Sequence, residues 1–232
     1  MKHIGVLGTG KTGSEVSNCL IENAYKITEF NRSNKFEHSK AKDLDGIICF
    51  LPGEAFLECF DELAKTKLPL VIGSTGYKLS EKQQATINSD TKAWVVSSNF
   101  AISMAIAKFC IEQIAQWSKS AQATDSIHEV HHKSKIDSPS GTALFWEQWI
   151  KNIKEGAKIE ISSDRLEDVP GTHKYKATCP SESLEIVHTA KNRKIFAQGA
   201  VWALETIGKT SSTGLVDFFE MVKEHYTKGT QV

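Results

Sequence analysis

The chain has 232 residues, of which 40% are hydrophobic, so it can bury a sizeable core in one or two domains. Lysine plus arginine and aspartate plus glutamate number 28 each, so no net basic charge favours a nucleic-acid partner. No leader segment is visible and no apolar run approaches the roughly 20 residues that span a bilayer, so we expect no membrane partner. The five cysteines form no C-x-x-C pair, which predicts reduced thiols in a cytoplasmic protein.

The N-terminus reads as a strand, a glycine turn and a helix. Ile4–Leu7 is a short apolar run, residues 8–13 form G-x-G-x-x-G, and residues 16–21 carry an apolar helical stripe. This is the order that a dinucleotide-binding βαβ unit requires, with the pyrophosphate on the helix N-terminus. An ordinary glycine turn is the alternative. We assign to cofactor binding the loop residues Gly8, Thr9, Gly10, Lys11, Thr12 and Gly13.

The second predicted strand, residues 25–30, bears on the choice of cofactor. An acid at this strand end usually binds the ribose hydroxyls of NAD, whereas arginine accommodates the extra phosphate of NADP. Asn31 and Arg32 occupy the tip, while Glu29 lies one residue before the strand ends. With Lys11 in the glycine loop, two cations can reach a 2′-phosphate. We therefore favour NADPH, with NADH possible, and the alternative is that Arg32 is a solvated loop residue.

Further short apolar strands, at residues 45–52, 69–72 and 93–96, alternate with helices. This alternation predicts a parallel sheet, whose ligands lie outside the carboxyl ends of the strands. The loops that follow the last two strands should therefore reach the nicotinamide. They supply the remaining cofactor-binding candidates, Gly73, Ser74, Thr75, Ser97, Ser98, Asn99 and Phe100.

The rest of the chain predicts a second domain of the α+β type. We expect helices over residues 104–117, 140–153 and 199–207, and strands over 123–130, 184–190 and 194–197. The polar stretch 162–173 reads as a loop. Strands that form an open sheet need burial on one side, so this sheet is a candidate oligomer interface.

Residues 129–143 hold the densest group of reactive side chains. Two imidazoles, His131 and His132, can transfer protons near neutral pH. A helix should begin near Ser140, and its free N–H groups and dipole suit an anion. A cationic pocket at a helix N-terminus suits a carboxylate substrate. The alternative is that these side chains are a solvated surface.

The same segment contains the pattern H-E-x-x-H at residues 128–132, which is a zinc motif only on a helix. This segment reads as a strand, and four residues along a strand span roughly 13 Å. That distance is too long for one Zn²⁺ with bonds of about 2 Å, so we expect no metal.

Residues 129–143, Glu-Val-His-His-Lys-Ser-Lys-Ile-Asp-Ser-Pro-Ser-Gly-Thr-Ala, closely resemble the signature of the dihydrodipicolinate reductase (4-hydroxy-tetrahydrodipicolinate reductase) family. Residues 73–76, 98–100 and 185–200 also resemble segments of this family, so the resemblance covers nearly the whole chain. Two departures, Lys11-Thr12 in the glycine loop and Asn31 where a Glu commonly precedes Arg32, leave the nicotinamide preference open.

The resemblance implies an α/β fold with an N-terminal Rossmann dinucleotide-binding domain over residues 1–102, to which residues 208–232 return. It implies an α+β substrate-binding and oligomerisation domain with a mixed open sheet over residues 103–207, and a homotetramer. The implied reaction is NAD(P)H-dependent reduction of a small cyclic imine dicarboxylate, the hydroxylated precursor of tetrahydrodipicolinate, in diaminopimelate and lysine biosynthesis.

In this reading His131 is the general acid and Lys135 its cationic partner, and which of the two delivers the proton stays open. Both imidazoles and Lys135 should share a cleft with the nicotinamide. The substrate-binding residues would be His132, Ser140, Gly141, Thr142 and Arg193, although Arg193 also fits a surface turn. His188 reads as a packed strand residue. A reductase of another small imine or semialdehyde and a non-catalytic NADP(H) sensor are the alternative functions.

Overall fold

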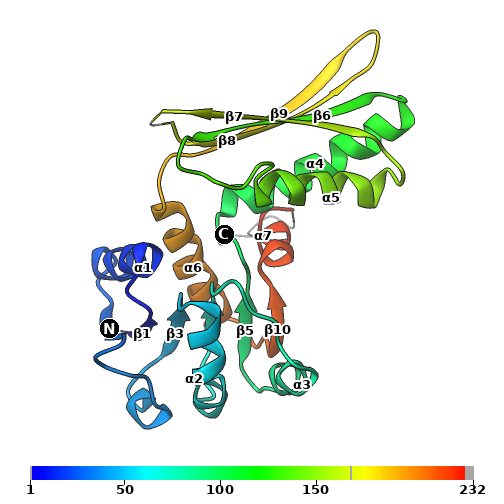
Figure 1. Ribbon diagram of the computed structural model, residues 1–232. Coiled ribbons are helices and arrows are strands. Elements are labelled where there is room, and N and C mark those ends of the chain that lie inside the picture. The colour runs from blue at the N-terminus through cyan, green and yellow to red at the C-terminus, as the bar shows by residue number, and fades with distance from the viewer. Residues whose placement is uncertain (1, 168, 228–232) are drawn as a thin grey trace. The chain divides into compact units, whose positions relative to one another are not determined.

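The computed structural model describes residues 2–167 and 169–227. The chain divides into two compact units (Figure 1). The first comprises Met1–Ile102 and Arg193–Val232, and the second comprises Ser103–Asn192. Each unit has its own sheet, and each is described by itself.

The first unit is built on a six-stranded parallel sheet with the order β10-β5-β4-β3-β1-β2. Its inner strands β1, β3, β4 and β5 are short apolar runs because both of their faces are covered. The edge strands β2 and β10 also contain polar and exposed residues. Their bounds are β1 His3–Leu7, β2 Lys26–Phe30, β3 Gly46–Cys49, β4 Leu70–Ile72, β5 Ala93–Val96 and β10 Gly214–Asp217.

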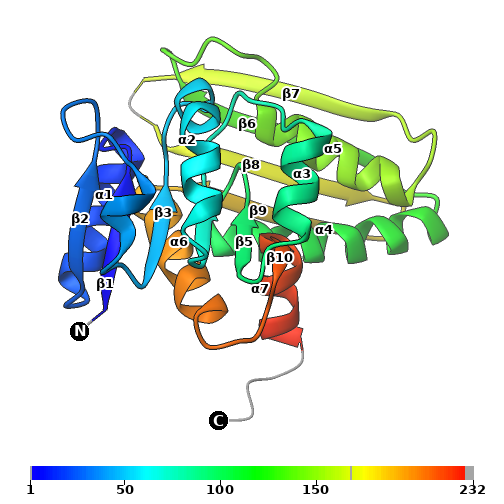
Figure 2. The same ribbon diagram turned by 90° about the horizontal axis from the view of Figure 1, so that it is seen from below.

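Helices α2 and α3 lie on one face of this sheet, and α6 packs on the other, where it also contacts α1 (Figure 2). The helical elements of the unit are α1 Lys11–Glu22, η1 His38–Ala41, α2 Gly53–Lys65, α3 Glu81–Asn88, α6 Lys194–Ile207 and α7 Phe218–Thr227. Within residues 2–167 and 169–227, no helix combines the length and the apolar character needed to cross a membrane.

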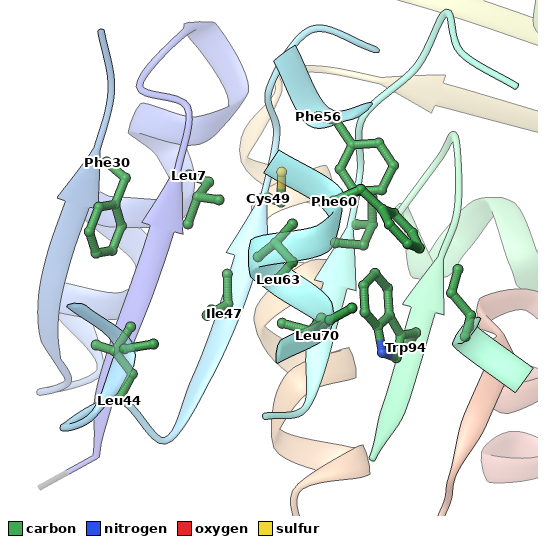
Figure 3. Close-up of a cluster of buried hydrophobic side chains, with 14 residues drawn as sticks. Leu7, Phe30, Leu44, Ile47, Cys49, Phe56, Phe60, Leu63, Leu70 and Trp94 are labelled. Carbon is green, nitrogen blue, oxygen red and sulfur yellow. The ribbon is translucent and has the colours of Figure 1, made fainter. Parts of the chain in front are cut away.

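The alternation of side chains along each strand divides the core between the two faces. Ile47 and Cys49 join Phe56 and Phe60 of α2 in one buried cluster, which Figure 3 shows. Gly46 points to the other face, where an added Cβ would lie 2.9 Å from the side chain of Leu204 in α6. The absence of a side chain at Gly46 therefore lets α6 approach the sheet closely.

The segment after residue 193 differs from the sequence expectation. Residues 194–197 are not a strand, because α6 begins at Lys194. Ala197, Ala200, Ala203 and Leu204 are buried at helical spacing, and the helix packs on β3, β4 and β5. The structure therefore places α6 in the first unit, whereas the domain boundary expected at residue 207 assigned it to the second. Strand β10 and helix α7 lie in the first unit, and residues 228–232 of the expected returning segment lie outside the described residues.

The second unit has a mixed four-stranded sheet with the order β7-β6-β8-β9, in which only the β6–β7 pair is parallel. Figure 1 shows helices α4 and α5 on one face of this sheet. Among the described residues of this unit, no helix covers the other face. The elements are α4 Ile102–Ser120, β6 Thr124–His132, α5 Gly141–Ile153, β7 Ile159–Leu166, β8 Gly171–Thr178 and β9 Ser183–Ala190.

The stretch 162–173, expected to be a loop, is mostly strand. It contains the end of β7 and the start of β8. Residues of β7 alternate between half-buried and exposed along its whole length. Because one face of the sheet lacks a helical cover, its outward positions accept polar residues, and the polar composition concealed the strand period.

Candidate active site

A cleft of about 630 Å³ opens at the carboxyl ends of β1, β2, β3 and β4 in the first unit. Parallel α/β sheets bind their ligands at this edge. The cleft brings together most of the predicted cofactor residues: Gly8, Thr9, Gly10, Lys11, Thr12, Gly13, Asn31, Arg32, Gly73 and Thr75. It is also lined by Ser33, Phe50, Leu51 and Pro52, which were not predicted. Their position directly after β2 and β3 is the signal that identifies them.

Two glycines shape the turn between β1 and α1. Gly8 has a φ of 90°, in the left-handed region that favours glycine, and a Cβ on it would lie 2.8 Å from the Phe50 carbonyl oxygen. A Cβ on Gly13 would lie 1.7 Å from the carbonyl oxygen of Gly8. No side chain caps α1, whose N-cap is Gly10. The N–H groups of its first turn and the positive end of the helix dipole therefore suit the pyrophosphate of a dinucleotide.

Asn31 organises the tip of β2. Its Oδ1 accepts hydrogen bonds from the backbone N–H groups of Ser33, at 2.9 Å, and Asn34, at 3.1 Å. The turn leaves Arg32 exposed at the cleft. Glu29 instead accepts a 2.5 Å hydrogen bond from the Ser17 hydroxyl. Among the described residues that line the cleft, the charged ones are Lys11 and Arg32, so the site suits an anionic group at the ribose.

The predicted residues Ser74, Ser97 and Ser98 line a neighbouring cavity of about 390 Å³, to which Thr75 also contributes. Ser74 is buried, with its Oγ 3.6 Å from the Cys49 sulfur. This cavity lies at the carboxyl ends of β4 and β5, beside the first cleft, with which it shares Thr75.

The structure does not bring Asn99 and Phe100 to the lining of either cavity. The Oδ1 of Asn99 accepts a 2.9 Å hydrogen bond from the Ala101 N–H. Phe100 is buried, and its ring lies 4.7 Å from that of Phe218 and 6.1 Å from that of Phe50, between ring centroids. Both residues hold the loop after β5 in place.

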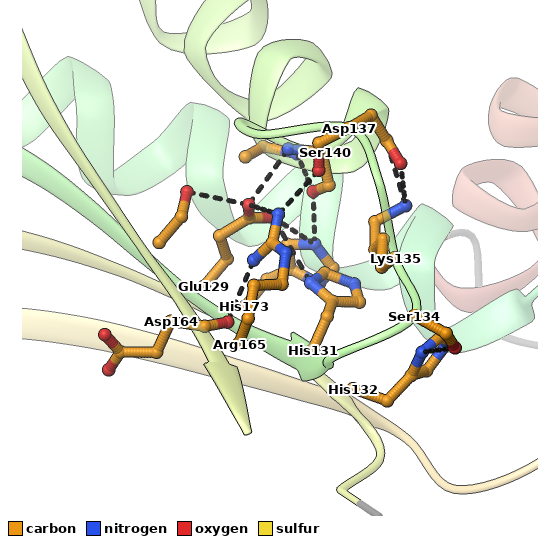
Figure 4. Close-up of polar contacts among 12 residues, drawn as sticks. Glu129, His131, His132, Ser134, Lys135, Asp137, Ser140, Asp164, Arg165 and His173 are labelled. Atoms are coloured by element: carbon orange, nitrogen blue, oxygen red, sulfur yellow. Dashed lines mark hydrogen bonds and ion pairs between the residues drawn. The ribbon is translucent and has the colours of Figure 1, made fainter. Parts of the chain in front are cut away.

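Strand β6 of the second unit carries the reactive segment. Its side chains alternate, so that Glu129 and His131 are buried and His132 is exposed. A ring nitrogen of His132, Nδ1, lies 2.7 Å from the Ser134 hydroxyl, away from the buried cluster (Figure 4). Successive residues of a strand point to opposite faces of the sheet. The expectation that the His131 and His132 imidazoles lie in the same cleft is therefore wrong.

The register of the sheet assembles a polar cluster around Glu129. On β6, Glu129 pairs with Ser163 of β7 and with His173 of β8, and His131 pairs with Arg165 of β7. Sequence reasoning missed these three partners because it assigned them to a loop. In the sequence only Ile159 and Ile161 alternate with polar residues, so the strand signal ends before Ser163 and Arg165.

Glu129 is fully buried and strongly hydrogen-bonded. Its Oε1 accepts from the Ser140 N–H at 2.9 Å, the Ser163 hydroxyl at 2.8 Å and the Arg165 guanidinium at 3.0 Å. Its Oε2 lies 3.4 Å from His131 Nδ1 and 3.5 Å from His173 Nε2. Figure 4 marks the contacts of the carboxylate with the guanidinium and with the two rings by dashed lines.

The environment sets the charge of each of these groups. Burial alone would raise the pKa of Glu129, but its hydrogen bonds from Ser140, Ser163 and Arg165 lower it to about 2. Burial lowers the pKa of His173 to about 4, and His131 adds to this effect. Burial also lowers the pKa of His131, and the Glu129 charge opposes that shift. At neutral pH the cluster therefore combines an ionised carboxylate and a cationic guanidinium with a neutral His173.

Lys135 lies beside this cluster in the loop after β6. Its ammonium binds both oxygens of Asp137, at 2.8 and 2.9 Å. The Lys135 charge lowers the pKa of His131, so it acts electrostatically on that ring. The backbone carbonyl of Asp137 accepts a 2.6 Å hydrogen bond from Arg165, which ties the loop to β7.

Helix α5 begins where the sequence predicted, with Ser140 as its N-cap. The Ser140 hydroxyl accepts a 3.2 Å hydrogen bond from the Ala143 N–H and lies 3.0 Å from His173 Nε2. The N–H of Ser140 already binds Glu129, so it is not available to a substrate carboxylate, contrary to expectation. Gly141 and Thr142 are the remaining predicted N–H donors of this turn; Gly141 is exposed and Thr142 half-buried.

Arg193 and His188 are the two further positions that the sequence singled out. Arg193 is exposed, immediately precedes α6, and belongs to the first unit. His188 is buried on β9, with its Nε2 2.9 Å from the Ser103 hydroxyl. The packed role expected for His188 is confirmed.

The H-E-x-x-H pattern forms no helical zinc motif, because residues 128–132 lie in β6. A different group could hold a metal ion, since Glu129, His131 and His173 each offer a donor atom within 4.8 Å of the others. A carboxylate with two neutral imidazoles is a donor set that Zn²⁺ accepts. In this cluster the Arg165 guanidinium is hydrogen-bonded to the Glu129 carboxylate and balances its negative charge. The protein itself therefore supplies the positive charge that a metal ion would bring.

Family models described as dihydrodipicolinate reductase, N-terminus, and dihydrodipicolinate reductase, C-terminus, match residues 2–100 and 103–222. A 4-hydroxy-tetrahydrodipicolinate reductase of Bdellovibrio bacteriovorus is 31% identical over 89% of this chain and 90% of its own. A 4-hydroxy-tetrahydrodipicolinate reductase of Christiangramia forsetii is 29% identical over 88% of this chain and 91% of its own. A dipicolinate-bound dihydrodipicolinate reductase from Paenisporosarcina sp. TG-14 has the same fold, with a TM-score of 0.77 and 18% identity over 94% of this chain and 97% of that one.

Proposed function

Since this chain belongs to the dihydrodipicolinate reductase family, we propose that it is an NAD(P)H-dependent oxidoreductase acting on 4-hydroxy-tetrahydrodipicolinate. The product is tetrahydrodipicolinate, formed when the substrate gains a hydride and a proton and loses its 4-hydroxyl group as water. It is an intermediate of diaminopimelate and lysine biosynthesis. One observation supports this proposal above the others. The same chain has a cleft suited to a dinucleotide and a buried His131 that lies near Lys135 and the N-terminus of α5.

The cofactor cleft fits a nicotinamide dinucleotide. Gly8 and Gly13 leave no room for side chains, and the uncapped start of α1 offers N–H groups to a pyrophosphate. Bound there, the reduced nicotinamide would supply a hydride. We propose NADPH as the preferred cofactor because Arg32 and Lys11 line the cleft while Glu29 is held by Ser17. NADH, which lacks the 2′-phosphate, would bind through the same glycine turn.

We propose that His131 is the general acid of the reaction and that Lys135 is its cationic partner. As hydride arrives, the substrate framework gains negative charge, and a nearby acid must supply a proton. The Lys135 ammonium would exchange the Asp137 carboxylate for a substrate carboxylate. We further propose that Gly141 and Thr142 donate N–H groups to the substrate and that Arg193 contacts it. His132 points away from His131 and receives no substrate contact in this proposal.

We propose a cytoplasmic homotetramer assembled through the sheet of the second unit. The outward positions of β8 and β9 combine the exposed Val187 with an ion pair between Lys174 and Glu185, 2.7 Å apart. A sheet face with mixed apolar and charged groups suits a symmetric interface. All five cysteines are free thiols, as expected in a reducing compartment.

The test is the oxidation of NADPH by the purified chain with freshly generated 4-hydroxy-tetrahydrodipicolinate. We expect turnover with this substrate, and none with a semialdehyde of similar size. His131→Gln or Lys135→Met should lower kcat about 10²-fold or more while the affinity for NADPH stays nearly the same. NADPH binding without any turnover would instead indicate a sensor, and an equal loss of cofactor binding would contradict the assigned roles.

A further inference from the structure

We infer that Glu129 is a positioning residue that sets the orientation and the charge state of the His131 imidazole. This inference rests on the proposed function, because it assigns Glu129 a role through the proposed general acid. In the sequence analysis Glu129 belonged to the rejected zinc pattern and to the family signature, but it had no role of its own.

The geometry of the ring carries the first part of the inference. His131 Nδ1 is buried, 3.4 Å from Glu129 Oε2, and neither atom has a hydrogen-bond partner among the described residues. On the other side, a Cβ built on Gly171 would lie 2.9 Å from His131 Nε2. The ring is therefore confined between a carboxylate and a backbone position that only glycine leaves open. This arrangement turns Nδ1 toward Glu129 and leaves Nε2 as the nitrogen available to a substrate.

The rigidity of the carboxylate carries the second part. Three donors from three different elements hold Glu129 Oε1, namely Ser140 at the start of α5 and Ser163 and Arg165 on β7. The other oxygen, Oε2, makes no hydrogen bond among the described residues, although it is fully buried. A buried acceptor that has no hydrogen-bond donor destabilises the folded chain. A protonated His131 provides the partner that Oε2 lacks.

The charges around His131 come from four segments. Glu129 on β6 and Asp137 in the following loop favour the protonated ring, and Lys135 in that loop and Arg165 on β7 oppose it. The ring of His173 on β8 lies 4.9 Å away, between ring centroids, and stays neutral at neutral pH. Of the two anions, Glu129 has the larger effect on the ring, and its Oε2 lies 3.4 Å from His131 Nδ1. Glu129 is therefore the group that favours the protonated form of His131.

The experiment compares the pH dependence of kcat in the wild type, Glu129→Gln and Arg165→Gln, and follows the His131 titration by NMR with labelled histidine. Removing the Glu129 charge should move the His131 midpoint to lower pH by about one to three units. At neutral pH kcat should then fall about tenfold or more, with the KM for NADPH unchanged. Removing the Arg165 charge should move the midpoint to higher pH. A purely structural role would not produce shifts of opposite sign.

Asp125→Asn is the matched control, because Asp125 is another buried, ion-paired acid on the same face of β6, and it contacts Lys154 instead of His131. Its pH profile should match that of the wild type. If Glu129→Gln fails to fold, Glu129→Asp keeps the charge while withdrawing the carboxylate, and should shift the midpoint by a smaller amount in the same direction.

The NMR titration tests the positioning role of Glu129 separately from the general-acid role of His131. If His131→Gln abolishes turnover but the His131 midpoint is the same in wild type and Glu129→Gln, the positioning role is wrong and the general acid stands. If His131→Gln retains turnover, the proposed general acid is wrong, and the NMR midpoint alone still decides whether Glu129 holds the ring.

Discussion

The carbonyl oxygen of Gly8 lies 1.7 Å from the place that a Cβ on Gly13 would occupy. The turn between β1 and α1 is thus closed by direct contact of two backbone segments. Gly13→Ala should force them apart and lower the free energy of unfolding by about 1–3 kcal/mol or more. Thermal unfolding measures this loss.

Gly10→Ala is the contrasting variant of the same loop, because nothing lies within 4 Å of a Cβ built there. It should leave the unfolding transition nearly unchanged and weaken NADPH binding instead. Equal unfolding curves for Gly10→Ala and Gly13→Ala would show that the close contact at Gly13 has no effect.

Arg32→Ala should weaken NADPH binding about ten- to a hundredfold, because a hydrogen-bonded charge contributes about 1.5–3 kcal/mol. Binding of NADH, which has no 2′-phosphate, should change little. Cofactor titrations followed by fluorescence measure both affinities. An equal loss for the two cofactors would remove the 2′-phosphate role from Arg32.

The buried end of β6 should control the stability of the second unit. Asp125 accepts hydrogen bonds from Ser118 at 2.7 Å and Tyr175 at 2.8 Å, and its other oxygen lies 2.7 Å from the Lys154 ammonium. Lys154→Met leaves the carboxylate buried without its counter-charge and should cost about 3–5 kcal/mol in urea unfolding. The exposed pair Lys151–Glu147 supplies the control, since Lys151→Met should cost less than about 1 kcal/mol.

His173 should make stability depend on pH. Its pKa is lowered from 6.5 to about 4 in the folded chain, chiefly by burial, so the unfolded chain takes up a proton between these values while the folded chain does not. The free energy of unfolding should therefore fall as the pH decreases from about 6.5 to about 4, by up to about 3 kcal/mol. His173→Gln should flatten this part of the profile. A slope equal to that of the wild type in urea unfolding at each pH would contradict the buried, neutral state.

Local sequence patterns determined most of the first unit and the reactive segment of the second. The apolar runs at β1, β3, β4 and β5 identify a parallel sheet, since each strand is buried on both faces. The glycine spacing likewise identifies the turn that holds Gly8 against Gly13, because such a turn depends only on neighbouring residues. Ser140 marks the start of α5 for the same reason.

Only the tertiary structure decided which side chains meet. Arg165 and His173 reach Glu129 through the pairing of β6 with β7 and β8, and strand register depends on partners remote in the sequence. Strand β7 was concealed because its polar outward positions obscure the alternation, and α6 was misread at its first turn because an apolar stretch of a few residues fits a strand or a helix equally well. Likewise, the neighbouring histidines 131 and 132 look equivalent in the sequence, and the pleat of β6 alone buries the first and exposes the second.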